Sequence, residues 1–288
     1  MAEKLMSFSD HLEELRTRLL HCLYALFGGM AIAYYFSDFF FVLLAQPLVR
    51  AWSHAGLGTP KLHFANPIEP FFTYMKISLI AGVFAASPFV FYQLWKFIAP
   101  GLYKNERRYV IPFTVASGVL FIGGAAFGYF VVFPYAFRFF LSFAQTNMGA
   151  MQKLLGGAVK VSMKQSFDLT PTLMMGEYFS LIWKLLLAFG LVFELPLLLI
   201  FLAMVGLVTY KSLWRFNRYF IILAFIVGAI LTPGPDVISQ ILMSAPLVVL
   251  YNVSILICFV LFRKKKATTL APAVDAETGA APGSDESP

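Results

Sequence analysis

Six long, charge-poor apolar stretches run through this chain of 288 residues, and they constrain its fold more than any other feature. A helix needs about 20 residues to cross the roughly 30 Å hydrocarbon core of a membrane. The composition agrees, since 59% of the residues are hydrophobic and 13% are charged, against roughly half and a quarter in soluble domains. The sequence therefore predicts an all-α integral membrane protein with six transmembrane helices, at about residues 19–44, 72–97, 109–137, 178–207, 219–231 and 237–262.

The regions outside this membrane domain (19–262) differ in character. Residues 1–18 carry leucines at helical spacing and are expected to form an amphipathic segment on the membrane surface. The first apolar stretch is too long for a cleavable signal peptide and is expected to be retained. Residues 263–288 begin with a basic cluster and continue into a segment rich in Ala, Pro, Gly and acidic residues, which predicts a disordered tail.

The distribution of basic residues predicts the orientation. Fourteen Lys and Arg residues lie on the side of the two termini and of the second and fourth loops, whereas eight lie on the other side. Cytoplasmic segments carry the excess of positive charge. Both termini are therefore expected in the cytoplasm, with the protein spanning the cytoplasmic (inner) membrane.

Prolines and span lengths predict departures from straight helices. Pro88, Pro134, Pro196 and Pro246 lie inside spans, where kinks are expected. The fifth and sixth spans are expected to be short, because the thirteen apolar residues 219–231 rise only about 20 Å. A short hydrophobic span either borrows flanking residues or thins the bilayer around it.

Two acidic residues near the predicted cytoplasmic surface are candidates for ligand contact. Glu106 lies in a charged loop between two spans, and Glu14 lies in the amphipathic segment. A carboxylate held among basic residues can pair with an arginine of an incoming peptide. The simpler reading is that Glu14 pairs with Arg18 four residues later, and that Glu106 neutralises its basic neighbours. Spacing alone favours the simpler reading.

Glu194 lies near the middle of the fourth span, where an ionisable side chain facing lipid costs at least about 2.5 kcal/mol. Lys184 is roughly 15 Å away along the helix axis, too far to pair. Glu194 is therefore protonated, solvated in a polar cavity, or reserved for a partner helix.

Several functions are excluded by the absence of their motifs. The sequence shows neither a catalytic triad arrangement nor a phosphate-binding glycine loop, and its histidines lack metal-ligand spacing. We therefore expect no enzyme, no cofactor and no bound metal. Nucleic-acid binding is not expected either, because the basic residues cluster at the ends of apolar runs. An alternative function is an ion-coupled secondary transporter or channel using Glu194, but the sequence contains no convincing internal repeat.

An ordered set of motifs resembles the TatC family, the multi-spanning subunits of the twin-arginine protein translocase. The motifs are HLEELRTRLL, FVFYQLWKFIAPGLYKNERR, YFVVFPYAF, FGLVFELP and LTPGPDVISQ, and the resemblance covers about residues 7–262. It implies a receptor that binds the signal peptides of folded proteins, which carry two consecutive arginines. It also implies a multimeric complex with the single-span partners TatA and TatB, in which the proton-motive force drives export.

The resemblance also assigns roles to individual residues. It implies that Glu14 and Glu106 bind the signal peptide, and that Glu194 forms an intramembrane polar site for partner helices. Neighbouring positions that matter for recognition or assembly are Arg16, Phe97, Pro100 and Arg107.

Two further residues are candidates for a role in the periplasmic loops, Pro47 and Asp236. Asp236 precedes the sixth span, where capping of that helix is favoured over contact with substrate. Its motif, LTPGPDV, carries one residue more than the commonest family form, LTPPDV.

Overall fold

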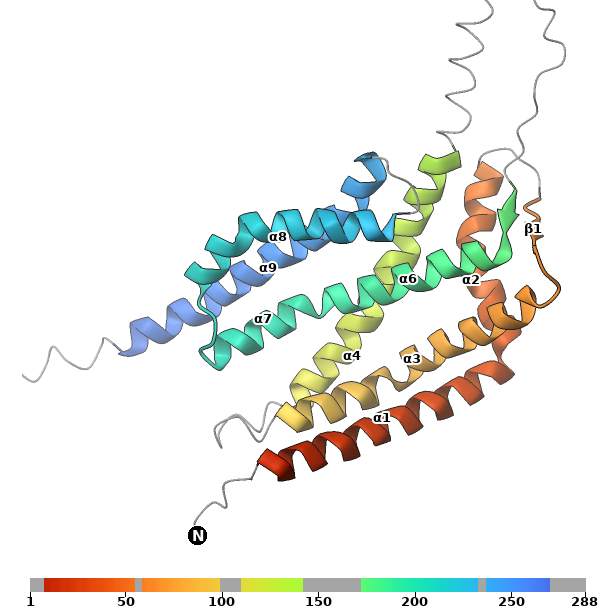
Figure 1. Ribbon diagram of the computed structural model, residues 1–288. Coiled ribbons are helices and arrows are strands. Elements are labelled where there is room, and N and C mark those ends of the chain that lie inside the picture. The colour runs from red at the N-terminus through yellow and green to blue at the C-terminus, as the bar shows by residue number, and fades with distance from the viewer. Residues whose placement is uncertain (1–7, 55–58, 99–109, 142–171, 233–236, 270–288) are drawn as a thin grey trace, which may run out of the picture.

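The computed structural model describes residues 8–54, 59–98, 110–141, 172–232 and 237–269, and the chain is almost entirely helical there (Figure 1). The elements are α1 (Phe8–Tyr35), α2 (Ser37–His54), β1 (Leu62–His63), α3 (Glu69–Ile98), α4 (Val110–Phe127), the π-helical turn η3 (Gly128–Val132), β2 (Leu173–Met174), α6 (Met175–Phe193), α7 (Leu195–Met204), α8 (Tyr210–Leu231) and α9 (Val237–Thr269).

The number of spans agrees with the prediction. Within the described residues, five helical segments are long and apolar enough to cross a membrane: α3, α4 with its continuation to Leu141, α6 with α7, α8, and α9. The pair α1 and α2 makes a sixth if it is counted as one bent span. An all-α membrane protein with six spans is thus confirmed.

The first span is not the straight helix expected over 19–44. The helix breaks at Phe36, and α2 leaves α1 at an angle of 82°. The new helix begins at Ser37, and Asp38 lies in its first turn. A negative side chain there is stabilised by the positive end of the helix dipole. Residues 8–18 and the first part of the span form one continuous helix, α1.

The prediction of short fifth and sixth spans was wrong. Helix α8 has 22 residues and α9 has 33, so α8 alone rises about 33 Å. The apolar stretch underestimated α8 because its first turns carry Lys211, Arg215 and Arg218. Long basic side chains near a span end can extend their charges toward the interface. The length of α8 therefore gives no reason to expect a thinned bilayer.

The prolines have local effects at two of the four positions. Pro134 follows the π-helical turn η3, in which the N–H of Phe133 donates to the carbonyl of Gly128. Pro196 lies in the first turn of α7, directly after the break at Glu194. Helices α3 and α9 continue through Pro88 and Pro246.

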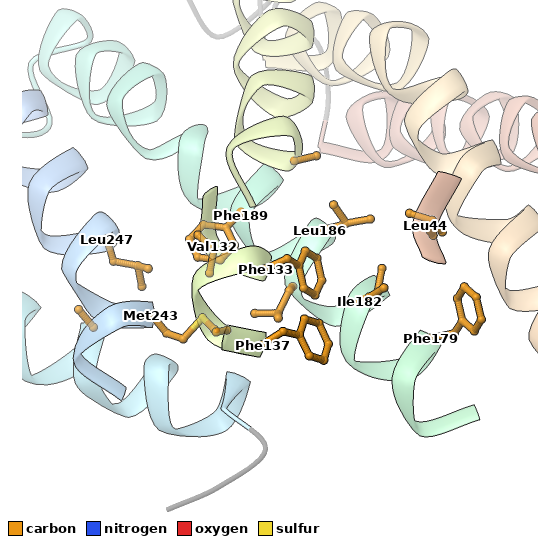
Figure 2. Packing of buried hydrophobic residues seen from close by; sticks show 14 of the residues in the cluster. Leu44, Val132, Phe133, Phe137, Phe179, Ile182, Leu186, Phe189, Met243 and Leu247 are labelled. Atoms are coloured by element: carbon orange, nitrogen blue, oxygen red, sulfur yellow. The ribbon is translucent and has the colours of Figure 1, made fainter. Parts of the chain in front are cut away.

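The helices pack around an aromatic and aliphatic core. Helices α1 and α3 lie side by side at one side, α8 and α9 at the other, with α4, α6 and α7 between them (Figure 1). Figure 2 shows Phe133, Ile182, Phe189 and Met243 meeting in the interior, and all four are at most 1% exposed. Burial of these side chains fixes how α6, α9 and the continuation of α4 after η3 meet.

Two glycines allow α1 and α3 to approach closely. A Cβ atom on Gly29 would lie 2.9 Å from the carbonyl oxygen of Gly82, closer than real Cβ atoms come to other atoms. Small residues at such a contact let membrane helices pack backbone against backbone. This packing holds the carboxyl-terminal part of α1 against α3.

The end of the bundle remote from the amino terminus is closed by a short parallel pairing of β1 with β2 (Figure 1). Beside it, the Glu69 carboxylate accepts hydrogen bonds from the N–H of Ala65 at 2.7 Å and of Gly176 at 2.6 Å. Glu69 therefore ties the segment before α3 to the first turn of α6.

Candidate functional site

Glu14 lies on the face of α1 that packs toward α3, and its side chain is 19% exposed. Its oxygen Oε1 accepts a hydrogen bond from Arg18 Nε at 2.9 Å and a second from Arg18 Nη2. The pair expected from i, i+4 spacing therefore exists. It is largely buried rather than a solvated surface pair, because the Arg18 side chain is only 14% exposed.

A residue of another helix holds Arg18 in place. Its Nη1 donates to Oε1 of Gln93, on α3, at 3.2 Å. The guanidinium thus joins the first turns of α1 to the last turns of α3. Burial leaves both charged groups with fewer water molecules, so that these hydrogen bonds count for more than they would on an open surface.

The second oxygen of Glu14 is left open. Oε2 is buried and has no hydrogen-bond partner among the described residues. His11 Nδ1 lies 3.9 Å from Oε2, which is beyond hydrogen-bond distance. A buried carboxylate oxygen without a donor is costly, so this atom is prepared to accept one.

His11 connects this carboxylate to Phe97. The two rings stack with centroids 4.4 Å apart and planes 11° from parallel. Phe97 was predicted from the family motif as a neighbour of the site, and it lies one residue before the end of α3. The carboxyl end of α3 and the beginning of α1 therefore meet around Glu14.

An open depression of about 450 Å³ lies over this junction. Its lining residues come from the beginning of α1 and from α3, and they are Asp10, Glu13, Glu14, Thr17, Arg18, His21, Gln93 and Lys96. Three carboxylates face two fixed cations there, so the depression favours a ligand that brings positive charge and N–H donors.

The remaining predicted signal-site residues divide into two groups. Arg16 is exposed on α1, two residues from Glu14 and so on a different face of the helix. Glu106, Pro100 and Arg107 lie outside the described residues.

The two candidates for the periplasmic loops also divide. Pro47 is buried inside α2 rather than in a loop. Asp236 lies outside the described residues.

Glu194 occupies the break between α6 and α7. Its N–H donates to the carbonyl of Leu191 at 3.1 Å, and its side chain is half-buried, with Oε1 unpaired among the described residues. The Ser117 hydroxyl of α4 lies beside this carboxyl group and accepts a hydrogen bond from Trp95 Nε1 of α3 at 2.9 Å. Three spans thus contribute to one polar cluster, which we call the Glu194 cluster: Glu194, Ser117 and Trp95.

Gln93, Ser117 and Trp95 were missed by the sequence analysis. Gln93 and Ser117 are isolated polar residues within apolar runs, and this isolation was the available signal. Among the residues that the structure describes, no three His, Cys, Asp or Glu side chains are grouped so as to hold a metal ion.

Comparison with known proteins gives consistent matches. The family model described as Sec-independent protein translocase protein (TatC) matches residues 10–246. The TatC of Desulforapulum autotrophicum is 42% identical over 263 residues, which cover 91% of this chain and 88% of that protein. The TatC of Aquifex aeolicus is 39% identical over 261 residues, covering 91% of this chain and 98% of that protein.

A solved structure agrees with the sequence matches. The crystal structure of the twin arginine translocase receptor TatC in DDM superposes with a TM-score of 0.69 at 38% identity, covering 86% of this chain and 99% of that one. These matches confirm the predicted resemblance and decide against an ion-coupled secondary transporter. The chain therefore belongs to the TatC family, and it is a multi-pass membrane subunit of the twin-arginine protein translocase rather than an enzyme.

Proposed function

We propose that the depression between α1 and α3 binds the twin-arginine signal peptide of folded precursor proteins, and that Glu14 accepts hydrogen bonds from one of the two arginines. The observation that carries this proposal is the unpaired, buried oxygen Oε2 of Glu14 beside an open, acidic depression. The similar protein of known structure is named a receptor, which is consistent with a binding role at this position.

The chemistry of the site favours an arginine ligand. A charge-assisted hydrogen bond from a guanidinium to a carboxylate contributes roughly 1.5–3 kcal/mol. Arginine presents five N–H donors in a planar fork, whereas lysine presents a compact and strongly hydrated ammonium. Because the guanidinium is the more weakly hydrated of the two, it loses less hydration free energy on binding to a partly buried carboxylate. The site therefore binds arginine more tightly than lysine.

Glu106 is the proposed second carboxylate of the site. It lies eight positions along the chain from Ile98, the last residue of α3. An extended chain of that length spans at most about 28 Å, so Glu106 is within reach of the depression. Arg16, Pro100 and Arg107 then act as neighbours that shape or assemble the site.

The charge distribution supports an orientation for this binding. Fourteen basic residues lie on the side of the termini and eight on the other, which favours cytoplasmic termini in the inner membrane. The depression at the start of α1 then faces the compartment from which precursors arrive.

The Glu194 cluster is proposed as the polar site for the single-span partners TatA and TatB. An unpaired carboxylate oxygen within a membrane span needs a donor. A polar side chain on a partner helix can supply it. Assembly of such partners around this subunit would couple export to the proton-motive force.

Signal-peptide affinity tests the proposed receptor site. The purified full chain in lipid nanodiscs is titrated with a labelled two-arginine signal peptide and followed by fluorescence anisotropy. Replacing the charge in Glu14→Gln weakens a charge-assisted contact, so we expect affinity to fall about tenfold or more. Glu106→Gln is expected to lower it as well.

Glu177→Gln is the matched control, because Glu177 is an exposed carboxylate at the first turn of α6. The affinity of this variant for the signal peptide should equal that of the wild type. Wild-type affinity in Glu14→Gln would contradict the proposal.

A further inference from the structure

We propose that Arg18 and Gln93 are positioning residues that hold Glu14 by one carboxylate oxygen, present the other to the signal peptide, and thereby set the preference for arginine over lysine. This inference rests on the proposed function of the depression. It assigns to the receptor's own arginine a part in selecting the arginine of the signal.

The Glu14–Arg18 pair differs from an ordinary helical surface pair. An exposed i, i+4 pair contributes only about 0.2–0.5 kcal/mol and exchanges readily with water. Here both side chains are more than four-fifths buried. The guanidinium is also held at its far end by Gln93, which lies 75 positions along the chain on α3. Arg18 is therefore fixed at both ends.

The pairing is asymmetric at the carboxylate. Nε and Nη2 of Arg18 both donate to Oε1, while Oε2 has no partner among the described residues. A carboxylate with two open oxygens can accept a cation from many directions. Glu14 offers a single oxygen in a fixed direction, so a ligand must bring a donor along that direction.

The same arrangement weakens the purely electrostatic attraction between the site and a cationic ligand. The positive charge of Arg18 offsets the negative charge of Glu14, and Lys96 adds a second cation to the lining. An incoming ammonium gains little net attraction and loses its hydration. A guanidinium donates to Oε2 with one N–H and keeps further donors for other acceptors, among them the exposed carboxylate of Glu13. Leaving a competing ligand desolvated without a matching partner is a recognised source of specificity.

The test compares two affinities for each variant. Full-length protein in nanodiscs is titrated with a two-arginine signal peptide and with the same peptide carrying two lysines. The measured quantity is the ratio of the two affinities. In Arg18→Gln, both oxygens of Glu14 become open and can accept a cation from many directions, so we expect the ratio to fall about tenfold, which corresponds to about 1.4 kcal/mol.

Two further variants separate geometry from charge. Arg18→Lys keeps the charge, but an ammonium cannot bond Glu14 Oε1 and Gln93 together in the same way, so the ratio should fall here too. Gln93→Leu frees the far end of Arg18 and should also lower the ratio. A ratio retained in Arg18→Lys would overturn the proposal, because charge alone would then be sufficient.

The matched control is the pair Arg50 and Gln46 on α2. These residues form the same kind of arginine-to-glutamine hydrogen bond, 3.2 Å long and exposed, away from the depression. Arg50→Lys and Gln46→Leu should leave the ratio unchanged. A variant that is merely less stable lowers both affinities together and leaves the ratio in place, which also counts against the proposal.

Failure of the proposed function is distinguishable from failure of this inference. If Glu14→Gln binds the two-arginine peptide as the wild type does, the receptor site itself is wrong. If Glu14→Gln loses binding while Arg18→Gln and Gln93→Leu keep the wild-type ratio, Glu14 binds the signal but its two neighbours do not set the selectivity.

Discussion

Glu194 has a backbone reason for its position as well as a side-chain one. Pro196 has no N–H, so the helical ladder that runs through α6 loses a donor at this point. The helix breaks at Glu194 and restarts as α7. A break inside a span is tolerated where neighbouring groups satisfy the freed backbone atoms. The Glu194 side chain and the missing backbone hydrogen bond at Pro196 therefore occur at the same place in the span. Such a place is suited to contact with a helix of a partner protein.

Substitution of Glu194 separates partner assembly from signal binding. Glu194→Leu removes every polar atom of the side chain. When this variant replaces the wild type in cells depleted of this protein, export of a folded reporter with a two-arginine signal should fall about tenfold or more. Affinity for the signal peptide should stay at the wild-type value, because the Glu14 depression is built from other residues. Export is followed by cell fractionation.

Glu194→Gln then distinguishes charge from hydrogen bonding. A glutamine that restores export indicates that a hydrogen bond suffices, and one that does not indicates a need for the negative charge. Wild-type export with Glu194→Leu would show that the Glu194 cluster is not a partner site. Glu177→Gln is again the matched carboxylate control.

Sequence reasoning found the charged residues more easily than the groups that organise them. Glu194 was selected because an ionisable residue is costly inside a membrane span, and Glu14 because the resemblance to the TatC family assigns it to the signal site. Gln93 and Ser117 are uncharged, and an apolar run tolerates a single amide or hydroxyl that bonds locally. Their contacts join residues of different helices, and no periodicity in one segment records such a contact.

At the scale of the helix, apolar length predicted which elements exist but not where they break. Transfer into lipid depends on the mean polarity of a stretch, and this mean is similar on both sides of Phe36. The 82° bend at that residue depends instead on tertiary packing and on a new helix start at Ser37. The beginning of α8 was missed for the opposite reason, because its basic first turns look too polar for a span.

The contact of α1 with α3 gives an element-scale prediction. Gly82→Val places a branched side chain where a Cβ alone would meet the backbone of Gly29 and Met30. We expect the two helices to separate and the thermal unfolding midpoint in detergent to fall by several degrees, consistent with an overpacking cost of about 1–3 kcal/mol. Signal affinity should fall with it, because Arg18 and Gln93 would no longer meet.

Gly123→Val is the control for helix propensity, since a Cβ built at Gly123 meets no atom of another helix within 4 Å. It should change the midpoint far less than Gly82→Val. Equal changes in the two variants would mean that loss of glycine, and not helix contact, determines the effect.

For the whole molecule, the proposed orientation is testable by labelling. Cys22 and Cys258 are first replaced by serine, and single cysteines are introduced by Ser9→Cys and His63→Cys. Because positively charged loops stay in the cytoplasm, a membrane-impermeant thiol reagent added to intact spheroplasts should label position 63 and not position 9. Inverted vesicles should give the reverse, and labelling of both positions from one side would contradict cytoplasmic termini.

The Glu69 carboxylate has a mechanical consequence for the whole bundle. It bonds the N–H groups of Ala65 and Gly176 together, next to the paired strands β1 and β2. Pulling α3 away from α6 at that end would break the bond from Gly176 to Glu69 together with the pairing of β1 with β2. Glu69 therefore holds the start of α3 and the start of α6 together at the end of the bundle that lies far from Glu14.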